Sequence, residues 1–427
     1  MANGHSTTNN GHDPKGTMHT LISFLGKSQL DPRGGYRKAV YRFEDGLQEE
    51  SSYFGLTLKN HLNPDRFVIL GTKTSMWDVF FEGVDEKDEA IEKRLELIDR
   101  LKSETLTEAN LRGLEAFVAK KLGMEAGSVL LRLIPFGRNE KEQLAVLKTM
   151  ASWVEVGDTV SLDVTHGFRH LPMLSFLSAL YLEQVKRAKI EGLYYGAAEM
   201  IQGGITPVLR LDGLLKIARW INAFHAFDHS GDYALLVPML SDSGLSKEEG
   251  ALLEEAAFFE RIQRDGQAKS KILQGLSGIE NLPALSPAGL FREALKERLA
   301  WAQEGRMFQR QAALAWRYLH RRDYLRAAIF AFEAFVTRLV QEGHGDPNSY
   351  EAHKIAKEDY ERQNPRDARF ESYRLLRNLR NALVHSTREN EGAVQKAVGS
   401  KEDLEATLKR VMAGLLATNP APGGPHG

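Results

Sequence analysis

The apolar pattern of this 427-residue chain changes once along its length, and this change limits the possible folds more than any other feature. From Thr20 to about Leu211, short apolar runs alternate with amphipathic segments. The runs of strand length cover 21–25, 38–43, 67–70, 129–134, 160–164 and 190–195. Runs this short, separated by helical segments such as 89–101 and 140–153, are typical of buried parallel strands with covering helices. We therefore expect an α/β Rossmann-like domain in the N-terminal half.

From Asp212 onward the pattern predicts helices alone. Apolar residues recur with a helical period over 213–226, 247–263, 289–319, 323–342 and 369–386. The length of the chain and its 42% hydrophobic content suffice for two cores. We therefore expect an α/β domain over 18–212 and an all-α domain over 213–418. The segments 1–17 and 419–427 have no apolar period, and we expect them to be disordered tails.

The amino-acid composition excludes several classes of functional site. The chain has no cysteine, which excludes disulfides, thiolate nucleophiles and Cys-ligated zinc or iron–sulfur centres. Its formal net charge is -1, so a nucleic acid would have to be bound by a local basic patch. No apolar run approaches the roughly 18 residues of a membrane span, and the polar N-terminus lacks the apolar region of a secretion signal. We therefore expect a cytoplasmic protein without membrane contact.

Polar, glycine-bearing loops follow most of the predicted strands. They cover 26–28, 71–77, 135–139, 163–170 and 195–199. In open parallel sheets, ligands bind beyond the carboxyl ends of the strands, where backbone N–H groups, hydroxyls and cations can hold phosphates. A capped turn is the simpler explanation for any one loop, with Thr165 as a helix cap and Gly167 as a turn residue. Several such loops at one edge favour a binding site, although neither a dinucleotide-binding nor an ATP-binding glycine motif is present.

The segment 377–385 places polar side chains on one face of a predicted helix. With Leu376, Leu379 and Leu383 as the buried stripe, residues 377, 381 and 385 follow one another at i, i+4 and i+8 on the opposite face. Arg380 lies at the flank of that face. We expect its side chain to curl over the face or to reach a partner chain.

An arginine, an asparagine and a histidine in this spacing suit metal-free RNA cleavage. The ordinary pKa of histidine, near 6.5, suits it to take a proton from a ribose 2'-OH or to return one to the leaving 5'-oxygen. Arginine stabilises the charge that builds on phosphorus. This chemistry uses the neighbouring 2'-OH as nucleophile, so it is restricted to RNA and leaves a cyclic phosphate. An Arg-x4-His pattern also arises by chance about once in a chain of this length, and a solvated helix face is the alternative.

On four motifs together, the chain resembles the CRISPR-associated CARF-HEPN ribonucleases of type III systems. The motifs are Ser23-Phe24-Leu25-Gly26, the segment 36–41, Asp163-x-Thr165-His166-Gly167-x-Arg169 and Arg380-Asn381-x3-His385. They span nearly the whole chain between the expected tails, and only 212–300 carries no recognised motif. The resemblance implies a CARF domain that binds a cyclic oligoadenylate and a HEPN domain that then cuts single-stranded RNA in antiviral defence.

The resemblance also implies roles for single residues. The activator pocket would be lined by Gly26, Lys27, Thr72, Ser75, Met76, Trp77, Gly137, Thr165, His166, Gly167, Arg169, Tyr195 and Gly196. Trp77 would either stack on an adenine or belong to the core. The catalytic pair falls on Arg380 and His385 with Asn381 assisting, supported by Arg377 and Asn378, while Glu333 could orient them. No metal or cofactor would be needed for catalysis.

The implied activator is cyclic tetra-adenylate, with cyclic hexa-adenylate as the main competitor. Family members act as dimers, and a ring with twofold symmetry is well matched by two copies of one pocket. We therefore expect a homodimer, and possibly a higher oligomer. Two alternatives stay open: a nucleotide-responsive regulator or scaffold without RNase activity, and a ring nuclease that degrades its own activator with Thr165, His166 and Lys27.

Overall fold

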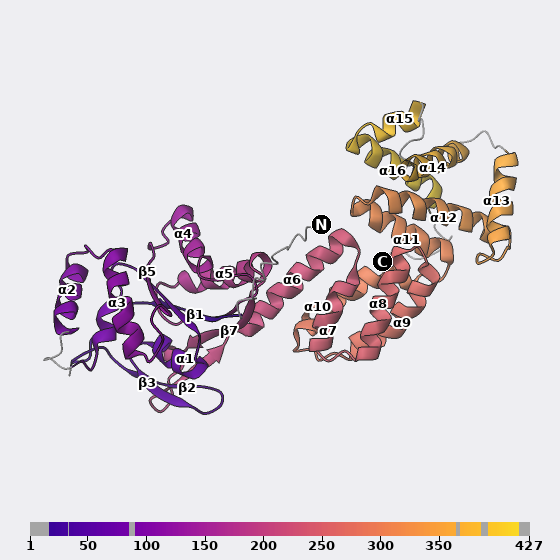
Figure 1. Ribbon diagram of the computed structural model, residues 1–427. Helices are drawn as coiled ribbons and strands as arrows, with labels where there is room; N and C mark the ends of the chain where they lie inside the picture. Colours follow the sequence, from indigo (N-terminus) through magenta and orange to yellow (C-terminus); the bar gives the residue numbers. More distant parts are fainter. Residues whose placement is uncertain (1–16, 33, 85–89, 364–367, 386–391, 418–427) are drawn as a thin grey trace, which may run out of the picture. The chain divides into compact units, whose positions relative to one another are not determined.

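The computed structural model describes residues 17–32, 34–84, 90–363, 368–385 and 392–417. Apart from Thr17, the expected tails at 1–17 and 419–427 therefore lie outside the described residues. The chain divides into two compact units, Met1–Ala218 and Arg219–Gly427. The division falls within one long helix, α6 (Asp212–Ser230). Each unit is described by itself below (Figure 1).

The first unit is built on one eight-stranded sheet with the order β3-β2-β8-β7-β6-β1-β4-β5. The strands are β1 (His19–Leu25), β2 (Ala39–Arg42), β3 (Gln48–Ser51), β4 (Arg66–Gly71), β5 (Val129–Leu133), β6 (Thr159–Asp163), β7 (Lys189–Gly196) and β8 (Ile205–Arg210). The five strands β7, β6, β1, β4 and β5 are parallel to one another. Their carboxyl ends therefore meet at one edge, as the sequence predicts.

Two strands were missed, and with them the mixed character of the sheet. β3 pairs antiparallel with β2, and β8 pairs antiparallel with β7 and parallel with β2. The β3 segment Gln-Glu-Glu-Ser has no apolar pattern, and β8 contains Pro207, which is unfavourable in a strand interior. Pairing with neighbouring strands therefore determines both elements, and the expectation of an all-parallel sheet is wrong at this side.

Helices cover both faces of the sheet. They are α1 (Phe54–Leu62), α2 (Ala90–Lys102), α3 (Glu108–Lys121), α4 (Glu140–Ala151) and α5 (Leu171–Val185), with the short η1 (Trp77–Phe81) and η2 (Ala198–Met200). Alternate residues of β1 point to opposite sides: Leu21 packs in the core with α1 and α3, and Ile22 in the core with α4 and α5. Each face of the strand layer is therefore buried under its own helices (Figure 1).

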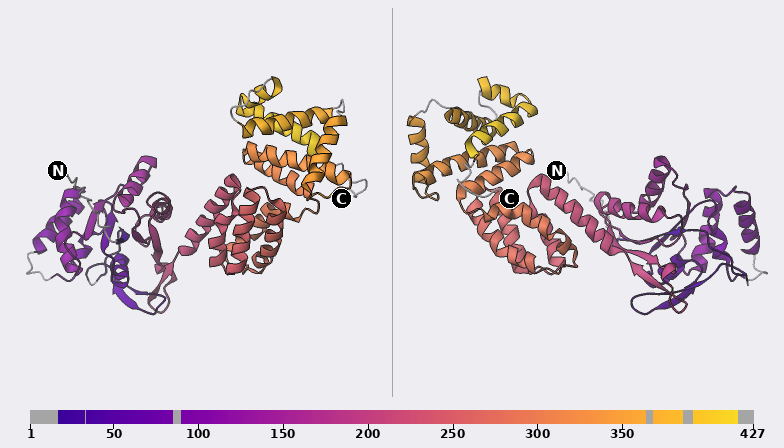
Figure 2. Two further views of the ribbon diagram at one scale, coloured as in Figure 1. Left: turned by 45° about the vertical axis from the view of Figure 1, so that its right-hand side comes forward. Right: turned by 180° about the vertical axis from the view of Figure 1, so that it is seen from behind.

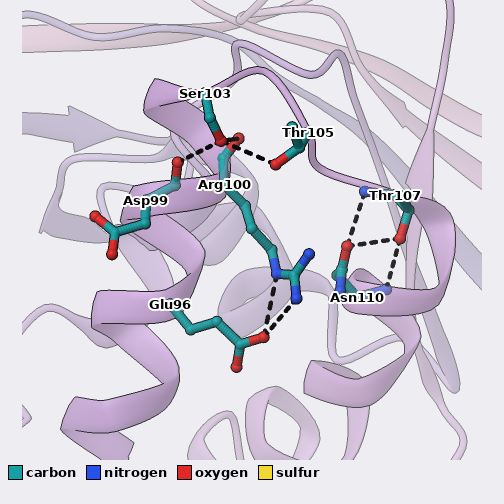
Figure 3. Close-up of polar contacts among 7 residues, drawn as sticks. All are labelled: Glu96, Asp99, Arg100, Ser103, Thr105, Thr107 and Asn110. Atoms are coloured by element: carbon teal, nitrogen blue, oxygen red, sulfur yellow. Dashed lines mark hydrogen bonds and ion pairs between the residues drawn. The ribbon is translucent and has the colours of Figure 1, made fainter.

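Side-chain contacts stabilise the end of α2 and the start of α3, on either side of the connection between these helices (Figure 3). Arg100 pairs with Glu96 one turn earlier at 2.8 Å. Thr107 caps α3 by accepting the backbone N–H of Asn110, while the side chain of Asn110 accepts the backbone N–H of Thr107. This reciprocal cap satisfies two N–H groups that a helix start would otherwise leave unpaired.

The second unit is helical throughout its described residues. Its helices after α6 are α7 (Val237–Asp242), α8 (Lys247–Arg261), α9 (Asp265–Asn281), α10 (Pro287–Leu299), α11 (Met307–His320), α12 (Tyr324–Glu342), α13 (Tyr350–Gln363), α14 (Ala368–Val384), α15 (Gly392–Val398) and α16 (Lys401–Leu416), with the short η3 (Tyr233–Leu236) and η4 (Ala300–Gln303). The helix predicted over 289–319 is two helices, α10 and α11, separated by η4. These helices bury one apolar core, and Figure 2 shows how they are arranged.

The predicted fold class is confirmed: a mixed α/β unit is followed by a helical unit. Within α14, the buried side recurs every three residues and comprises Phe370, Tyr373, Leu376, Leu379 and Ala382. Of the predicted stripe, Leu376 and Leu379 are fully buried, whereas Leu383 is only partly buried against the same core. No helix in the described ranges is long and apolar enough to span a membrane.

Candidate functional site

A pocket of about 150 Å³ lies at the carboxyl ends of β1 and β4, against the loop that follows β6. It is lined by Leu25, Gly26, Lys27, Thr72, Thr74, Ser75, Ile134, Gly167, Phe168 and Leu171. The pocket forms because β6, β1 and β4 are adjacent parallel strands, so their following loops converge. The predicted residues that the structure brings together here are Gly26, Lys27, Thr72, Ser75 and Gly167.

Two of these residues must be glycine for the loops to meet. A Cβ atom on Gly26 would lie 2.7 Å from the backbone nitrogen of Gly167. Gly167 has φ +106, and a Cβ there would lie 2.9 Å from Cδ1 of Leu171. A side chain at Gly26 would therefore force the β1 and β6 loops apart, and one at Gly167 would strain the backbone and displace Leu171.

Ser75 and Met76 hold the β1 and β4 loops together. The Ser75 hydroxyl donates to the backbone oxygen of Leu25 at 2.6 Å and accepts the N–H of Thr72 at 2.9 Å. The N–H of Met76 donates to the backbone oxygen of Gly26 at 2.9 Å. Both side chains are buried, so their role is to fix the shape of the pocket.

Trp77 is a core residue. Its side chain is 1% exposed, and its indole N–H donates to the backbone oxygen of Thr72 at 2.9 Å. The ring also packs against Gly71. Of the two roles left open for Trp77, burial excludes stacking on an adenine and leaves the structural one.

His166 and Thr165 point toward the protein backbone. The Nε2 atom of His166 accepts the N–H of Phe54 at 3.1 Å, and burial lowers the pKa of His166 to about 4. The ring is therefore neutral at pH 7, with its proton on Nδ1. The Thr165 hydroxyl accepts the N–H of Gly196 at 2.8 Å. These contacts tie the β6 loop to α1 and β7, and neither side chain lines the pocket.

The other predicted pocket residues also lie outside the lining, namely Gly137, Arg169, Tyr195 and Gly196. The Tyr195 hydroxyl donates to Glu199 at 2.5 Å, and the side chain of Arg169 is exposed. Five lining residues carried no predicted role: Leu25, Thr74, Ile134, Phe168 and Leu171. Their places at or shortly after the ends of β1, β4, β5 and β6 were the only sequence signal for them.

A buried acid lies beneath the pocket loops. Asp163, 1% exposed, accepts a hydrogen bond from the Ser23 hydroxyl at 2.5 Å and another from the N–H of Thr165 at 2.8 Å. The Tyr53 hydroxyl lies 2.6 Å from that of Ser23. Burial raises the pKa of Asp163 to about 6, and the two hydrogen bonds to the carboxylate limit the rise.

This raised pKa predicts how stability depends on pH. Because the folded state holds the proton of Asp163 more tightly, this group stabilises the protein fully below about pH 4 and loses that contribution as pH rises through about 6. Asp163→Asn cannot ionise. Its free energy of unfolding, relative to wild type, should therefore increase by on the order of 2–3 kcal/mol between pH 4 and pH 7. Urea denaturation at several pH values measures this difference; parallel pH profiles would contradict the prediction.

In the second unit, α14 directs the predicted catalytic residues to different places. Arg377 donates to Glu361 of α13 at 2.7 Å, and the Tyr373 hydroxyl donates to the same carboxylate oxygen at 2.6 Å. Arg377 therefore joins α14 to α13. Asn378 and Asn381 are half-buried, and His385, one residue beyond the helix, is exposed. The backbone N–H of His385 donates to the backbone oxygen of Asn381 at 2.9 Å.

Arg380 turns toward α12. Its guanidinium lies 4.5 Å from the centre of the Phe332 ring, and its Nε is buried without a hydrogen-bond partner among the described residues. Glu333 is the neighbouring acid: burial raises its pKa, and the charge of Arg380 opposes that rise. His385 follows the last residue of α14 and is exposed, whereas Arg380 lies within the helix and is partly buried against α12.

Arg380 lines a cavity of about 640 Å³, which we call the α12–α13 cavity. Other lining residues come from α12, α13, the turn before α9 and the start of α11; they include Asp265, Gln311, Phe332, Glu333, His353 and Lys357. His385 and Asn381 are not part of this lining. In the described part of the chain, no group of three or more His, Asp or Glu residues is arranged to hold a metal ion.

Comparisons with known proteins include a family model located in the first unit. Residues 20–199 match the family model described as "CRISPR system endoribonuclease Csx1, CARF domain". The "CRISPR-associated protein MJ1674" of Methanocaldococcus jannaschii is 27% identical over 245 residues, which cover 53% of this chain and 38% of that protein. The chain therefore aligns with less than half of that relative. A solved structure of Enterococcus italicus Csm6 bound to cyclic hexa-2'-fluoro-hexa-dAMP covers 94% of both chains at 11% identity, with a TM-score of 0.37.

Proposed function

We propose that this chain, a CARF-containing CRISPR-associated protein, binds a cyclic oligoadenylate with its first unit and is thereby switched on to cleave single-stranded RNA with its second. The observation that carries the proposal is the CARF match over residues 20–199, whose pocket lies at the carboxyl edge of the sheet. The RNase half is supported by the Arg380-Asn381-x3-His385 segment on α14. With this activity, the protein would act in type III CRISPR antiviral defence.

The size of the pocket supports a ligand shared by two chains. At about 150 Å³ it is smaller than the roughly 300–1,000 Å³ of typical small-molecule sites, and a ring of four adenylates is larger than most such ligands. Two copies related by a twofold axis would each supply half of the contacts. Cyclic tetra-adenylate is the activator that we favour, with cyclic hexa-adenylate as competitor.

An exposed stripe on α5 supports the homodimer. Met173, Leu177, Tyr181 and Val185 follow one another at intervals of four residues and are 69%, 54%, 37% and 57% exposed. Such a stripe of apolar side chains on one helix face is typical of an interaction surface. Because α5 begins at the pocket-lining Leu171, a second copy packed on this face would lie close to the activator site.

The proposed cleavage is metal-independent. The 2'-OH attacks the neighbouring phosphorus, the 5'-oxygen leaves, and a 2',3'-cyclic phosphate remains. Arg380 stabilises the charge on phosphorus, and His385 transfers protons. Because Arg380 lines the α12–α13 cavity and His385 does not, we propose that the RNA site combines residues of two chains. Asn381 and Asn378 would assist at its edge, and Glu333 would orient Arg380.

An RNA-cleavage assay tests the proposal. A labelled single-stranded RNA is incubated with the full-length protein and cyclic tri-, tetra- or hexa-adenylate, with and without EDTA. We expect cleavage only with an activating ring, cyclic phosphate ends on the products, and no effect of EDTA. If the RNA stays intact with every ring, the RNase proposal is wrong and the regulator or scaffold alternative remains. Inhibition of cleavage by EDTA would exclude the metal-independent mechanism.

The ring-nuclease alternative has less support from the geometry. Of the three groups assigned to it, the Thr165 hydroxyl and the His166 Nε2 already accept backbone N–H groups. The low pKa of His166, about 4, also makes it a poor proton donor at neutral pH. Lys27 alone of the three lines the pocket. Chromatography of the ring after incubation with His385→Ala protein separates pocket cleavage from RNase action.

Activator binding should depend on the contact between Gly26 and Gly167. Saturating cyclic tetra-adenylate should raise the Tm of the wild type, because a ligand at about 100 times its Kd stabilises the native state by about 2.7 kcal/mol. Gly167→Val should lose this shift, since its Cβ would meet Leu171 and its φ is +106. The matched control is Gly113→Ala on α3, where a Cβ has nothing within 4 Å. An unchanged shift in Gly167→Val would contradict this assignment.

A further inference from the structure

We infer that the α12–α13 cavity is a subsite for the RNA strand, in which cations of α13 and α14 take phosphate and Tyr350 at its rim stacks on a base. The inference deepens the proposed function and rests on it in taking RNA as the ligand. The cavity volume, about 640 Å³, lies within the roughly 300–1,000 Å³ typical of ligand sites. It is also the cavity into which Arg380 turns.

One wall of the cavity carries the two lysines Lys354 and Lys357. His353 and Lys357 lie one turn apart on α13 and therefore on one face of it, beside Lys354. The ring of His353 donates from Nε2 to the backbone oxygen of Pro347 at 2.8 Å, which fixes its orientation. With Arg380 opposite, this wall supplies the local positive charge that a chain of net charge -1 needs to bind RNA.

The cavity lining holds more cations than acids: Arg264, Lys354, Lys357 and Arg380 against Asp265 and Glu333. Asp265 lies 3.5 Å from Arg310, outside the cavity lining, and its carboxylate also accepts from Gln311 at 3.3 Å. Burial raises the pKa of Glu333, and the charge of Arg380 opposes that rise. In the described part of the chain, Arg380 makes no ion pair within 4 Å; its guanidinium rests on Phe332. Its donors are therefore not committed to a protein carboxylate.

Tyr350 supplies a surface for a base. It is the first residue of α13, lines the cavity and is 78% exposed. An aromatic side chain this exposed contributes little to the apolar core, whereas unpaired bases stack readily on such rings. A strand that stacks one base on Tyr350 can place the adjoining phosphate on Lys357 and Arg380, which line the same cavity.

The first test removes the stacking surface. Full-length protein is titrated, by fluorescence anisotropy, into a labelled single-stranded RNA whose 2'-hydroxyls are methylated, so that it cannot be cleaved. Tyr350→Ser should weaken binding on the order of tenfold, the scale of one lost stacking contact. Tyr350→Phe, which keeps the ring and loses the hydroxyl, should bind like the wild type. Because Tyr350 is exposed, neither change should lower the Tm appreciably.

The second test adds a charge to the cavity at a position where the backbone has room for a side chain. Gly266 lines the cavity in the first turn of α9, where a Cβ meets nothing within 4 Å. Gly266→Glu should weaken RNA binding about fivefold at low salt and less at high salt, because repulsion is screened. Gly266→Gln has the same shape without the charge and should bind normally. An acid in the first helical turn is favourable, so Gly266→Glu should not unfold the protein.

The outcomes separate this inference from the proposed function. Wild-type affinity in both Tyr350→Ser and Gly266→Glu would overturn the subsite, whether or not the protein cleaves RNA. Weaker binding in both variants, with Tyr350→Phe and Gly266→Gln unchanged, supports it. If no ring then triggers cleavage by the wild type, the RNase proposal fails while the RNA subsite stands.

Discussion

Arg380→Ala is expected to abolish activated RNA cleavage, with a loss of at least about 10²–10³-fold in rate, the usual effect of removing a group that stabilises transition-state charge. The structure places the guanidinium of Arg380 on Phe332 at the edge of the α12–α13 cavity. A change to alanine removes the guanidinium group, whose N–H donors are arranged to bind two phosphate oxygens at once. Single-turnover cleavage of labelled RNA, with cyclic tetra-adenylate present, measures the loss.

Two controls show whether the loss of cleavage comes from catalysis and not from activator binding. The Tm increase caused by cyclic tetra-adenylate should be the same in Arg380→Ala as in wild type, because the activator pocket belongs to the other unit. Arg380→Lys keeps the positive charge but lacks the planar set of guanidinium N–H donors, and we expect this variant to retain only part of the wild-type activity. Wild-type cleavage by Arg380→Ala would exclude Arg380 from catalysis.

The second large effect is expected for His385→Ala. Loss of a positioned acid or base typically costs about 10²–10⁴-fold in rate. His385 is exposed at the end of α14, so alanine there should change the free energy of unfolding by no more than about 0.5 kcal/mol. Cleavage rates should fall while RNA affinity stays near that of the wild type, since the side chain lies outside the α12–α13 cavity.

A matched histidine serves as the control for His385. His225 on α6 is also exposed and lines neither cavity. His225→Ala should therefore cleave RNA at the wild-type rate. If His385→Ala retained full activity, proton transfer would have to come from another group, and the motif on α14 would lose its assigned role.

Apolar periodicity predicted most of the fold because burial produces it directly. The strand runs 21–25, 67–70 and 129–134 appear in the structure as β1, β4 and β5 with small changes at their ends. β3 could not be predicted this way, since its residues are polar and their conformation follows from pairing with β2. Local pattern therefore predicted the buried strands and missed those whose conformation depends on a partner strand.

The candidate site was predicted less completely, for a related reason. Parallel strand ends meet at one edge, which explains why the loops carrying Gly26, Thr72 and Gly167 converge. The direction of an individual side chain depends on residues far away in the sequence: His166 turns to the backbone of Phe54, 112 residues earlier. The α12–α13 cavity was beyond prediction because its walls come from separate helices and turns.

The contact between Gly26 and Gly167 has a mechanical consequence. Because a Cβ on Gly26 would lie 2.7 Å from the backbone nitrogen of Gly167, main chain lies against main chain there, and we expect a displacement of one loop to be passed directly to its neighbour. The side chains that line the pocket, such as Lys27 and Thr74, take no part in this backbone contact. Under the proposed function, substitutions of these side chains can therefore change which ring is bound without altering the backbone contact that would transmit binding.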